Sequence, residues 1–135
     1  MSRGLRNNNP GNIRINKDKF QGEVVPSQDK AFKQFETMAY GYRAVFVTLD
    51  TYRKRGLNTI DKIIRSWAPP EDNNHTENYI NYVVKWSGVT KDKVLTQSSG
   101  NEYKKIVAAM SRVENGKDAS MADVETGFRM QDRIQ

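Results

Sequence analysis

The sequence predicts a mostly helical α+β domain with one small sheet or hairpin near its N-terminus. Two patterns along the chain predict this class. In residues 12–35 apolar residues tend to alternate with polar ones, which is the period of strands, and from residue 38 they recur every three or four positions, which is the period of helices. A length of 135 residues is most economically one domain with one modest core, so residues 1–135 are treated as a single domain.

The extended part consists of three short runs. Residues 12–16 alternate isoleucines with polar neighbours, and residues 20–25 can form a return strand after the polar turn at 17–19. The third run, residues 31–35, follows a polar loop after Pro26. We expect these runs to form the small sheet.

Helical periodicity in the rest of the chain predicts about five to six helices. Residues 131–135 are expected to fray. The residues expected to cap the starts of helices are Asn58, Thr76, Asn101 and Ser120. The residues expected to end them are Gly56, Pro69, Gly88 and Gly116.

The composition excludes several kinds of chemistry. Without cysteine, the chain has no disulfide, no thiolate metal site and no cysteine nucleophile. A single histidine, His75, argues against a histidine metal cluster or a catalytic triad, so we expect neither a metal nor another cofactor. No apolar run approaches the roughly 20 residues that span a bilayer, and no signal peptide is visible.

The formal net charge of +6 favours polyanionic partners, including nucleic acid and the anionic bacterial cell wall. The basic residues are spread along the chain rather than gathered in one block. This distribution weakens the interpretation as a nucleic-acid-binding protein, although charge alone does not choose between the two partners.

The run from Arg3 to Arg14 contains three asparagines followed by Pro10 and Gly11. Proline fixes its own backbone and favours an extended conformation at Asn9, and Gly11 permits a turn. A rigid turn rich in amide side chains presents many donors and acceptors, which suits a polar, uncharged ligand such as a sugar. The alternative is a capped turn that only precedes a strand.

The chain's catalytic chemistry, if it has any, must depend on carboxylates. Glycoside cleavage needs a carboxylic acid whose pKa is raised by apolar surroundings, so that it can protonate the leaving oxygen. Glu114 fits this requirement best, because it ends an apolar helix and because the negative end of the helix dipole disfavours its ionisation. The alternative is a solvated glutamate beside a helix C-cap.

Other carboxylates compete with Glu114 for a catalytic role. Asp29 lies in the loop that leads to Phe32 and Phe35, where a second carboxylate could orient water. Trp67 and Trp86 could stack on sugars, although Trp67 completes an apolar helical stripe that favours a place in the core. The remaining competing carboxylates are Glu23, Glu36 and Asp72.

The run Arg6–Arg14 resembles the start of a family of phage and prophage lysozyme-like proteins, members of which are often labelled virion structural proteins. The resemblance covers nearly the whole chain. It continues through Phe20-Gln21-Gly22, Asp29-x-x-Phe32-x-x-Phe35, Tyr40-Gly41-Tyr42-Arg43-Ala44, Thr59-Ile60 to Trp67-Ala68-Pro69-Pro70, Asn73 to Tyr79-Ile80, and Glu114-Asn115-Gly116.

A second resemblance is to lytic transglycosylases and flagellar-type glucosaminidases. In those proteins a helix ending in glutamate precedes the strand, the aromatic-x-Gly turn and the helical half. Here the strand-like segment and the Phe20 turn come first, and the helix ending in Glu114 comes last. The resemblance therefore implies a circularly permuted lysozyme-like domain, in which the N-terminal hairpin and the Glu114 helix lie side by side across the cleft. Phe20 and Asn115 depart from the Trp and Ser usual in these relatives.

The resemblance implies a peptidoglycan-cleaving muramidase or lytic transglycosylase that acts on the bond between N-acetylmuramic acid and N-acetylglucosamine. Glu114 would be its acid, and in a hydrolase Asp29 would position water. The expected partners are glycan strands and other virion proteins, and the expected location is the virion, or the host cytoplasm before delivery to the wall. The residues expected to line the saccharide cleft are Asn9, Asn12, Arg14 and Tyr42.

Two other classes of function stay open at this point. The first is a non-catalytic module that binds the cell wall or serves as a structural part of the virion. The second is a small basic nucleic-acid-binding protein, whose affinity for DNA would fall steeply with salt. Against the second stands the lack of a concentrated basic helix or an interleaved aromatic patch.

Overall fold

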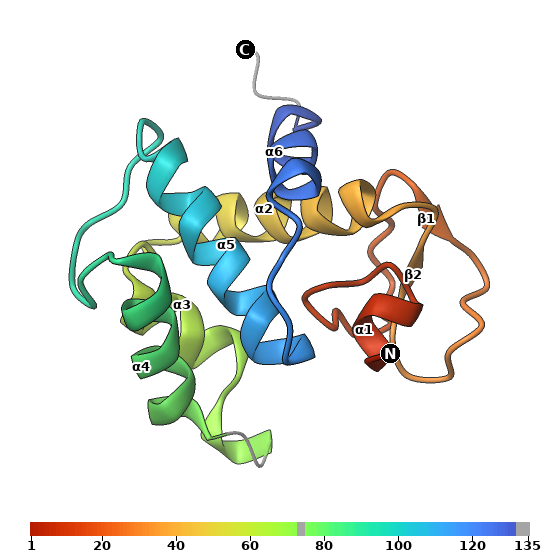
Figure 1. Ribbon diagram of the computed structural model, residues 1–135, viewed down its shortest axis with the longest axis horizontal. Coiled ribbons are helices and arrows are strands. Elements are labelled where there is room, and N and C mark those ends of the chain that lie inside the picture. The colour runs from red at the N-terminus through yellow and green to blue at the C-terminus, as the bar shows by residue number, and fades with distance from the viewer. Residues whose placement is uncertain (73–74, 132–135) are drawn as a thin grey trace.

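The computed structural model describes residues 1–72 and 75–131, and these form a mostly helical α+β fold (Figure 1). The expected fold class is therefore confirmed. Most of the expected frayed segment, residues 132–135, lies outside the described residues. The helices and strands in chain order are α1 (Arg3–Arg6), β1 (Glu23–Val24), β2 (Gln34–Phe35), α2 (Met38–Lys54), α3 (Ile60–Trp67), the 3-10 helix η1 (Pro70–Asp72), α4 (Thr76–Ser87), α5 (Gly100–Asn115) and α6 (Met121–Arg129).

The sheet is smaller than the sequence predicts. Strands β1 and β2 pair antiparallel over two residues each, with Glu23 opposite Phe35. The run 12–16 forms no strand, and only Arg14 makes an isolated bridge, with Phe32. The predicted run loses its first residue because Asn12 takes a left-handed backbone, with φ 51°, which is not the extended conformation that a strand requires.

Helix α1 was not predicted. The Oγ of Ser2 accepts a hydrogen bond from the backbone N–H of Leu5 at 3.1 Å, which caps this single turn. A four-residue helix that contains a glycine shows no helical periodicity, so the sequence gives no pattern from which to infer it.

Three helix starts differ from the expected caps, each by one or two residues. Thr59 rather than Asn58 caps α3, and its Oγ1 accepts from the N–H of Lys62 at 3.2 Å. Thr76 is the first residue of α4, and its hydroxyl instead donates to the carbonyl of Ala68 at 2.6 Å. Helix α5 begins before the expected cap Asn101.

Other helix boundaries agree with the sequence. Ser120 caps α6 by accepting from the N–H of Asp123 at 3.3 Å. Gly88 and Gly116 follow α4 and α5 in the left-handed conformation that favours glycine at this position. Among the described residues, no helix is both long enough and apolar enough to cross a membrane.

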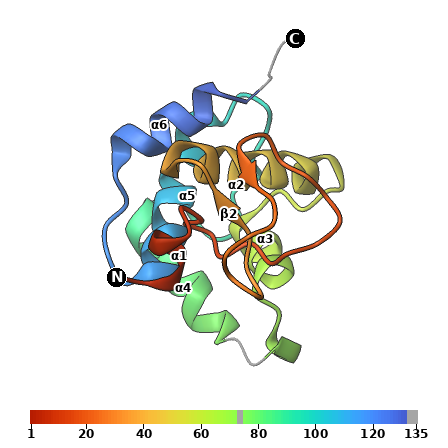
Figure 2. The same cartoon turned by 90° about the vertical axis from the view of Figure 1, so that its right-hand side faces the viewer.

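The core lies among the long helices. Helix α2 runs through the middle of the molecule, α6 packs along it, and α4 packs against both α3 and α5 (Figures 1 and 2). The largest fully buried apolar side chains come from β2, α2, α3, α4, α5 and the chain before α5: Phe35, Tyr42, Val45, Leu49, Ile60, Ile63, Ile64, Ile80, Leu95, Ile106 and Met110.

The Asn9 side chain holds the N-terminal segment in shape. Its Oδ1 accepts from the N–H of Ile13 at 2.9 Å, and its Nδ2 donates to the carbonyls of Ile13 at 3.0 Å and of Lys33 at 2.8 Å. The residue is 0% exposed. Asn9 therefore supplies hydrogen bonds to the N–H of Ile13 and the carbonyl of Lys33 that a neighbouring strand would supply in a larger sheet. It also adds a second donor to the carbonyl of Ile13, which already accepts from the N–H of Lys33.

We expect Asn9→Ala to lower the free energy of unfolding by roughly 2–5 kcal/mol, because the N–H of Ile13 and the carbonyl of Lys33 lose the Asn9 side chain as their partner. The carbonyl of Ile13 loses one of its two donors and keeps the N–H of Lys33. The control is Asn101→Ala at an exposed position of α5, with an expected change within about 0.5 kcal/mol. Urea unfolding followed by circular dichroism measures both values. Equal stabilities of the two variants would contradict the role of Asn9.

Candidate active site around Glu114

The N-terminal segment lies beside the C-terminal end of α5 (Figure 1). The hydroxyl of Ser2 donates to Oδ1 of Asn115 at 2.7 Å, and Nδ2 of Asn115 donates to the carbonyl of Pro10 at 3.0 Å. A Cβ at Gly4 would lie 2.5 Å from Oδ1 of Asn115, so only glycine permits this approach. The part of the chain that lies beside the Glu114 helix is therefore the segment before the sheet, whereas the expectation named the N-terminal hairpin.

The Glu114 carboxylate contacts side chains from three other parts of the fold. Nδ2 of Asn12 donates to Oε1 at 2.9 Å, and the hydroxyl of Tyr79 on α4 donates to Oε2 at 2.9 Å. The side chain of Trp67, at the end of α3, supplies a third hydrogen bond. The carboxylate thus lies where the N-terminal segment, α3, α4 and α5 meet.

Burial is the dominant influence on the ionisation of Glu114. It raises the pKa of Glu114 above its ordinary value of 4.5, while the hydrogen bonds from Asn12, Tyr79 and Trp67 act in the opposite direction. The pKa of Tyr79 is raised well above its ordinary value by burial, and the neighbouring Glu114 charge adds to this rise. The phenol therefore remains a donor to the carboxylate throughout the physiological pH range.

The Asn12 amide can form a hydrogen bond with Glu114 whether the carboxyl group is ionised or protonated. Its Oδ1 is buried and has no hydrogen-bond partner among the described residues, whereas its Nδ2 donates to the carboxylate. Rotation of the amide exchanges the donor for an acceptor, so the same side chain can receive the O–H of a protonated Glu114. The left-handed backbone at Asn12, which asparagine tolerates better than most residues, aims the amide at α5.

A groove of about 330 Å³ extends from the contacts of Glu114. The segment 12–20 forms one wall, and the end of α3 together with η1 forms the other. Asn12 and Trp67 line the groove and also contact Glu114, which connects the acid to this space. The other lining residues are Ile13, Arg14, Asn16, Asp18, Phe20, Thr48, Tyr52, Ser66, Pro69 and Asp72.

Glycine is required at position 11 because a side chain there would not fit, and not because of the backbone angle. A Cβ at Gly11 would lie 2.8 Å from the Trp67 ring and 2.9 Å from a Val45 methyl group. The left-handed positions of the motif belong to Asn8 and Asn12, with φ 52° and 51°. The tight contact with Gly11 fixes Trp67 between the N-terminal segment and the groove.

Two of the four expected cleft residues do line the groove, and two do not. Asn12 and Arg14 line it. Asn9 is fully buried and bonded to backbone, and Tyr42 is 1% exposed with its hydroxyl 2.9 Å from that of Ser111. We therefore reassign Asn9 and Tyr42 from substrate binding to the interior, because neither presents a polar atom to solvent.

Asp29 does not join Glu114. It accepts from Nε and Nη2 of Arg3 at 2.6 and 2.7 Å, from Nδ2 of Asn7 at 3.1 Å, and from the N–H groups of Ala31 and Phe32. These donors hold the pKa of Asp29 far below its ordinary range. The expectation that Asp29 positions water is thus corrected: its carboxylate anchors the loop before β2 to α1.

A buried ion pair supports one wall of the groove. Nζ of Lys33, a side chain that is 0% exposed, lies 3.0 Å from Oε2 of Glu23 and donates to the carbonyl of Asp18 at 2.7 Å. The second bond holds the loop that contributes Asp18 and Phe20 to the groove. Lys33 therefore positions part of the groove without reaching it.

Sequence reasoning missed Tyr79 and Lys33. Tyr79 occupies an apolar helical stripe, and periodicity treats such a residue as core without regard to its hydroxyl. Lys33 shares the alternation of Phe35, which places both on the inward face of the strand. A charged residue on that face was the signal that could have identified it.

Comparison with known proteins places the chain in a bacteriophage protein family. No family model matches it. Over 132 residues it is 39% identical to Protein P5 of Pseudoalteromonas phage PM2, and the match covers 94% of this chain and 80% of that protein. The chain belongs to the family of this phage protein.

We expect Glu114→Gln to stabilise the protein increasingly as pH rises. Because the folded state raises the pKa of Glu114, it binds more protons than the unfolded state between the ordinary and the raised value, and stability falls as pH rises through that window. The variant has no such group. Thermal unfolding at a series of pH values from about 4 to about 8 measures the difference, and a difference that is constant with pH contradicts this assignment.

We expect Asp29→Asn to change the pH dependence of stability in the opposite direction from Glu114→Gln. The lowered pKa of Asp29 stabilises the fold above its ordinary value of 3.8, and this stabilisation is lost as pH falls toward the folded-state value. The variant should therefore melt at a lower temperature than the wild type at neutral pH, with a gap that narrows in acid. Asp92→Asn at an exposed site is the control, and equal melting temperatures for both variants contradict the anchoring role.

Proposed function

We propose that this phage protein cleaves peptidoglycan at the bond between N-acetylmuramic acid and N-acetylglucosamine. The observation that supports this most directly is Glu114, a carboxyl group withdrawn from water, with a raised pKa, and connected through Asn12 and Trp67 to a groove of ligand size. An acid that holds its proton more readily than a solvated glutamate suits protonation of a glycosidic oxygen.

In the proposed reaction Glu114 gives its proton to the glycosidic oxygen as the bond from that oxygen to the muramyl C1 breaks. The sugar alcohol leaves, and positive charge develops at C1 and the ring oxygen. The resulting Glu114 carboxylate accepts hydrogen bonds from Asn12 and Tyr79, which stabilise it at the stage when it has lost the proton.

The second half of the reaction distinguishes the two forms of the enzyme. In a lytic transglycosylase the muramyl 6-hydroxyl attacks C1 and Glu114 takes its proton, which regenerates the acid and leaves a 1,6-anhydro sugar. In a hydrolase, water attacks and a second carboxylate positions it. The commitment of Asp29 to Arg3 and to loop amides removes Asp29 as that second carboxylate. Asp18 and Asp72 also line the groove, so the released products distinguish the two forms.

We also propose delivery by the virion, in keeping with the phage family. A virion brings its proteins to the bacterial surface from outside. The formal charge of +6 would favour adsorption of the protein to anionic wall polymers.

The test is digestion of purified peptidoglycan by the wild type and by Glu114→Gln, with mass spectrometry of the released fragments. We expect the variant to be slower by about 10²- to 10⁴-fold, the usual contribution of a general acid. The matched control is Glu36→Gln, an exposed glutamate outside the site, which should keep full activity. Anhydro-muropeptides identify transglycosylation, and reducing ends identify hydrolysis.

Two results would contradict parts of the proposal. Undiminished digestion by Glu114→Gln would remove Glu114 from the mechanism. Cosedimentation of the wild type with peptidoglycan, without any released fragment, would instead identify a wall-binding module that has no catalytic turnover.

A further inference from the structure

The groove beside Glu114 carries charges of both signs. Arg14 and Asp18 lie on the wall formed by the N-terminal segment, and Asp72 of η1 lies on the opposite wall. All three side chains are exposed, and none of them forms an ion pair among the described residues. Three charges that have no ion-pair partner within residues 1–72 and 75–131 are thus available to a ligand in the groove.

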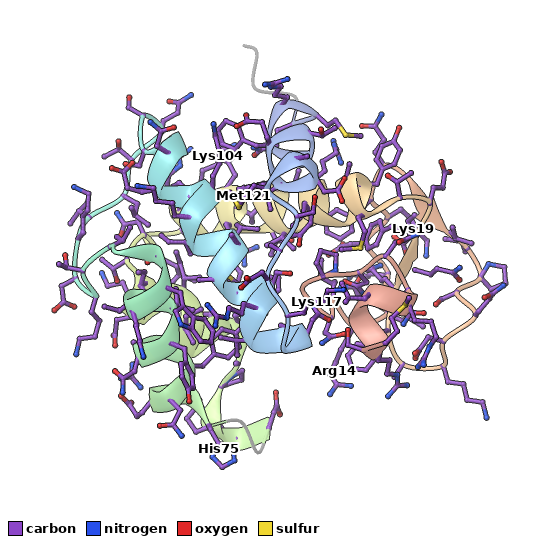
Figure 3. All side chains as sticks on the ribbon, viewed as in Figure 1. Arg14, Lys19, His75, Lys104, Lys117 and Met121 are labelled. Atoms are coloured by element: carbon purple, nitrogen blue, oxygen red, sulfur yellow. The ribbon has the colours of Figure 1, made fainter. Side chains whose placement is uncertain are left out.

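Contacts within the protein restrict the movement of two of these charged residues, Arg14 and Asp18. The guanidinium of Arg14, which projects from the N-terminal segment (Figure 3), lies 5.0 Å from the centre of the Phe32 ring. This cation–π contact restricts its side chain. The backbone of Asp18 is held by the buried Nζ of Lys33 at 2.7 Å. Such support lowers the entropy lost when a ligand binds these groups.

An uncharged glycan would gain little binding free energy from these three charges. Neutral hydroxyl and acetamido groups are recognised by amides and aromatic rings, which Asn12, Asn16, Tyr52 and Trp67 already supply to the groove. Covering a charged side chain with a neutral ligand costs free energy, because the charge loses water and gains no partner of opposite sign. The charges favour a ligand that itself carries an anion and a cation.

We propose that the groove binds the peptide stem attached to the muramyl residue, and this rests on the proposed cleavage of peptidoglycan. The stem carries carboxylates and, on its diamino acid, an ammonium group. Arg14 pairs with a stem carboxylate, and Asp18 and Asp72 receive the ammonium. The substrate class is therefore peptide-bearing glycan rather than bare glycan.

The test measures binding in the Glu114→Gln background, so that the ligand is not consumed. The probes are disaccharide–tetrapeptide oligomers and the same glycans after an amidase has removed the peptide, with titration followed by Trp fluorescence. We expect the peptide-bearing form to bind about tenfold more tightly than the stripped form, which is the gain that one charge-assisted contact provides. This ratio of affinities should decrease in high salt.

Further variants locate this preference in the groove. Adding Arg14→Gln or Asp18→Asn should reduce the preference toward unity, whereas Arg129→Gln on α6 and the exposed Asp92→Asn should leave it unchanged. Thermal unfolding of each variant verifies that it is folded under the conditions of the titration.

The outcomes separate this proposal from the proposed function. Equal affinity for stripped and peptide-bearing glycan overturns stem recognition but leaves glycan cleavage intact. A preference that survives both Arg14→Gln and Asp18→Asn overturns the assignment to this groove. If neither glycan binds and peptidoglycan is not digested, the proposed function fails together with this inference.

Discussion

The fold depends above all on the buried amide of Asn9. The sheet is too short to hold the N-terminal segment by a strand ladder, since each strand has two residues. Asn9, which is itself fully buried, compensates with three hydrogen bonds to the backbone of Ile13 and Lys33. Because these bonds fix both ends of the turn that contains Asn12, they also decide where the Asn12 amide meets α5. A side chain thus does the structural work that a third strand does in a larger sheet.

The site combines two opposing influences on one carboxyl group. Burial among four parts of the fold favours the neutral acid, and three donors favour the anion. Burial is the larger influence, so the carboxyl group holds its proton more readily than a solvated glutamate, while the hydroxyl of Tyr79 is already in place to donate to the anion. The Tyr79 donor needs no movement at the moment of reaction, and the Asn12 amide needs only to rotate. The same logic explains why a tyrosine with a raised pKa is a suitable partner, because it donates a hydrogen bond without becoming charged.

The sequence predicts the parts of this molecule that depend on local pattern. Helical periodicity located the long helices, and the glycines after α4 and α5 marked their ends. Glu114 was predicted because an acid at the end of an apolar helix is a local feature. Asn9 and Tyr42 were misplaced because burial is a tertiary property: the same amide or phenol can face solvent or the core with no change in its neighbours. Asp29 was misassigned because its partner Arg3 belongs to a helix that shows no periodicity. The roles of Lys33 and Tyr79 could be recognised only once the packing of the strand and the helices was known.

The contact between Asn12 and Glu114 joins positions 102 residues apart in sequence. Closing a loop of that length carries an entropy cost that only the packing of the intervening helices can offset. A chain in which this segment has not joined α5 lacks the hydrogen bond from Asn12 to Glu114. The partners of the acid come from segments far apart in the sequence, so the assembled site exists only in the complete fold.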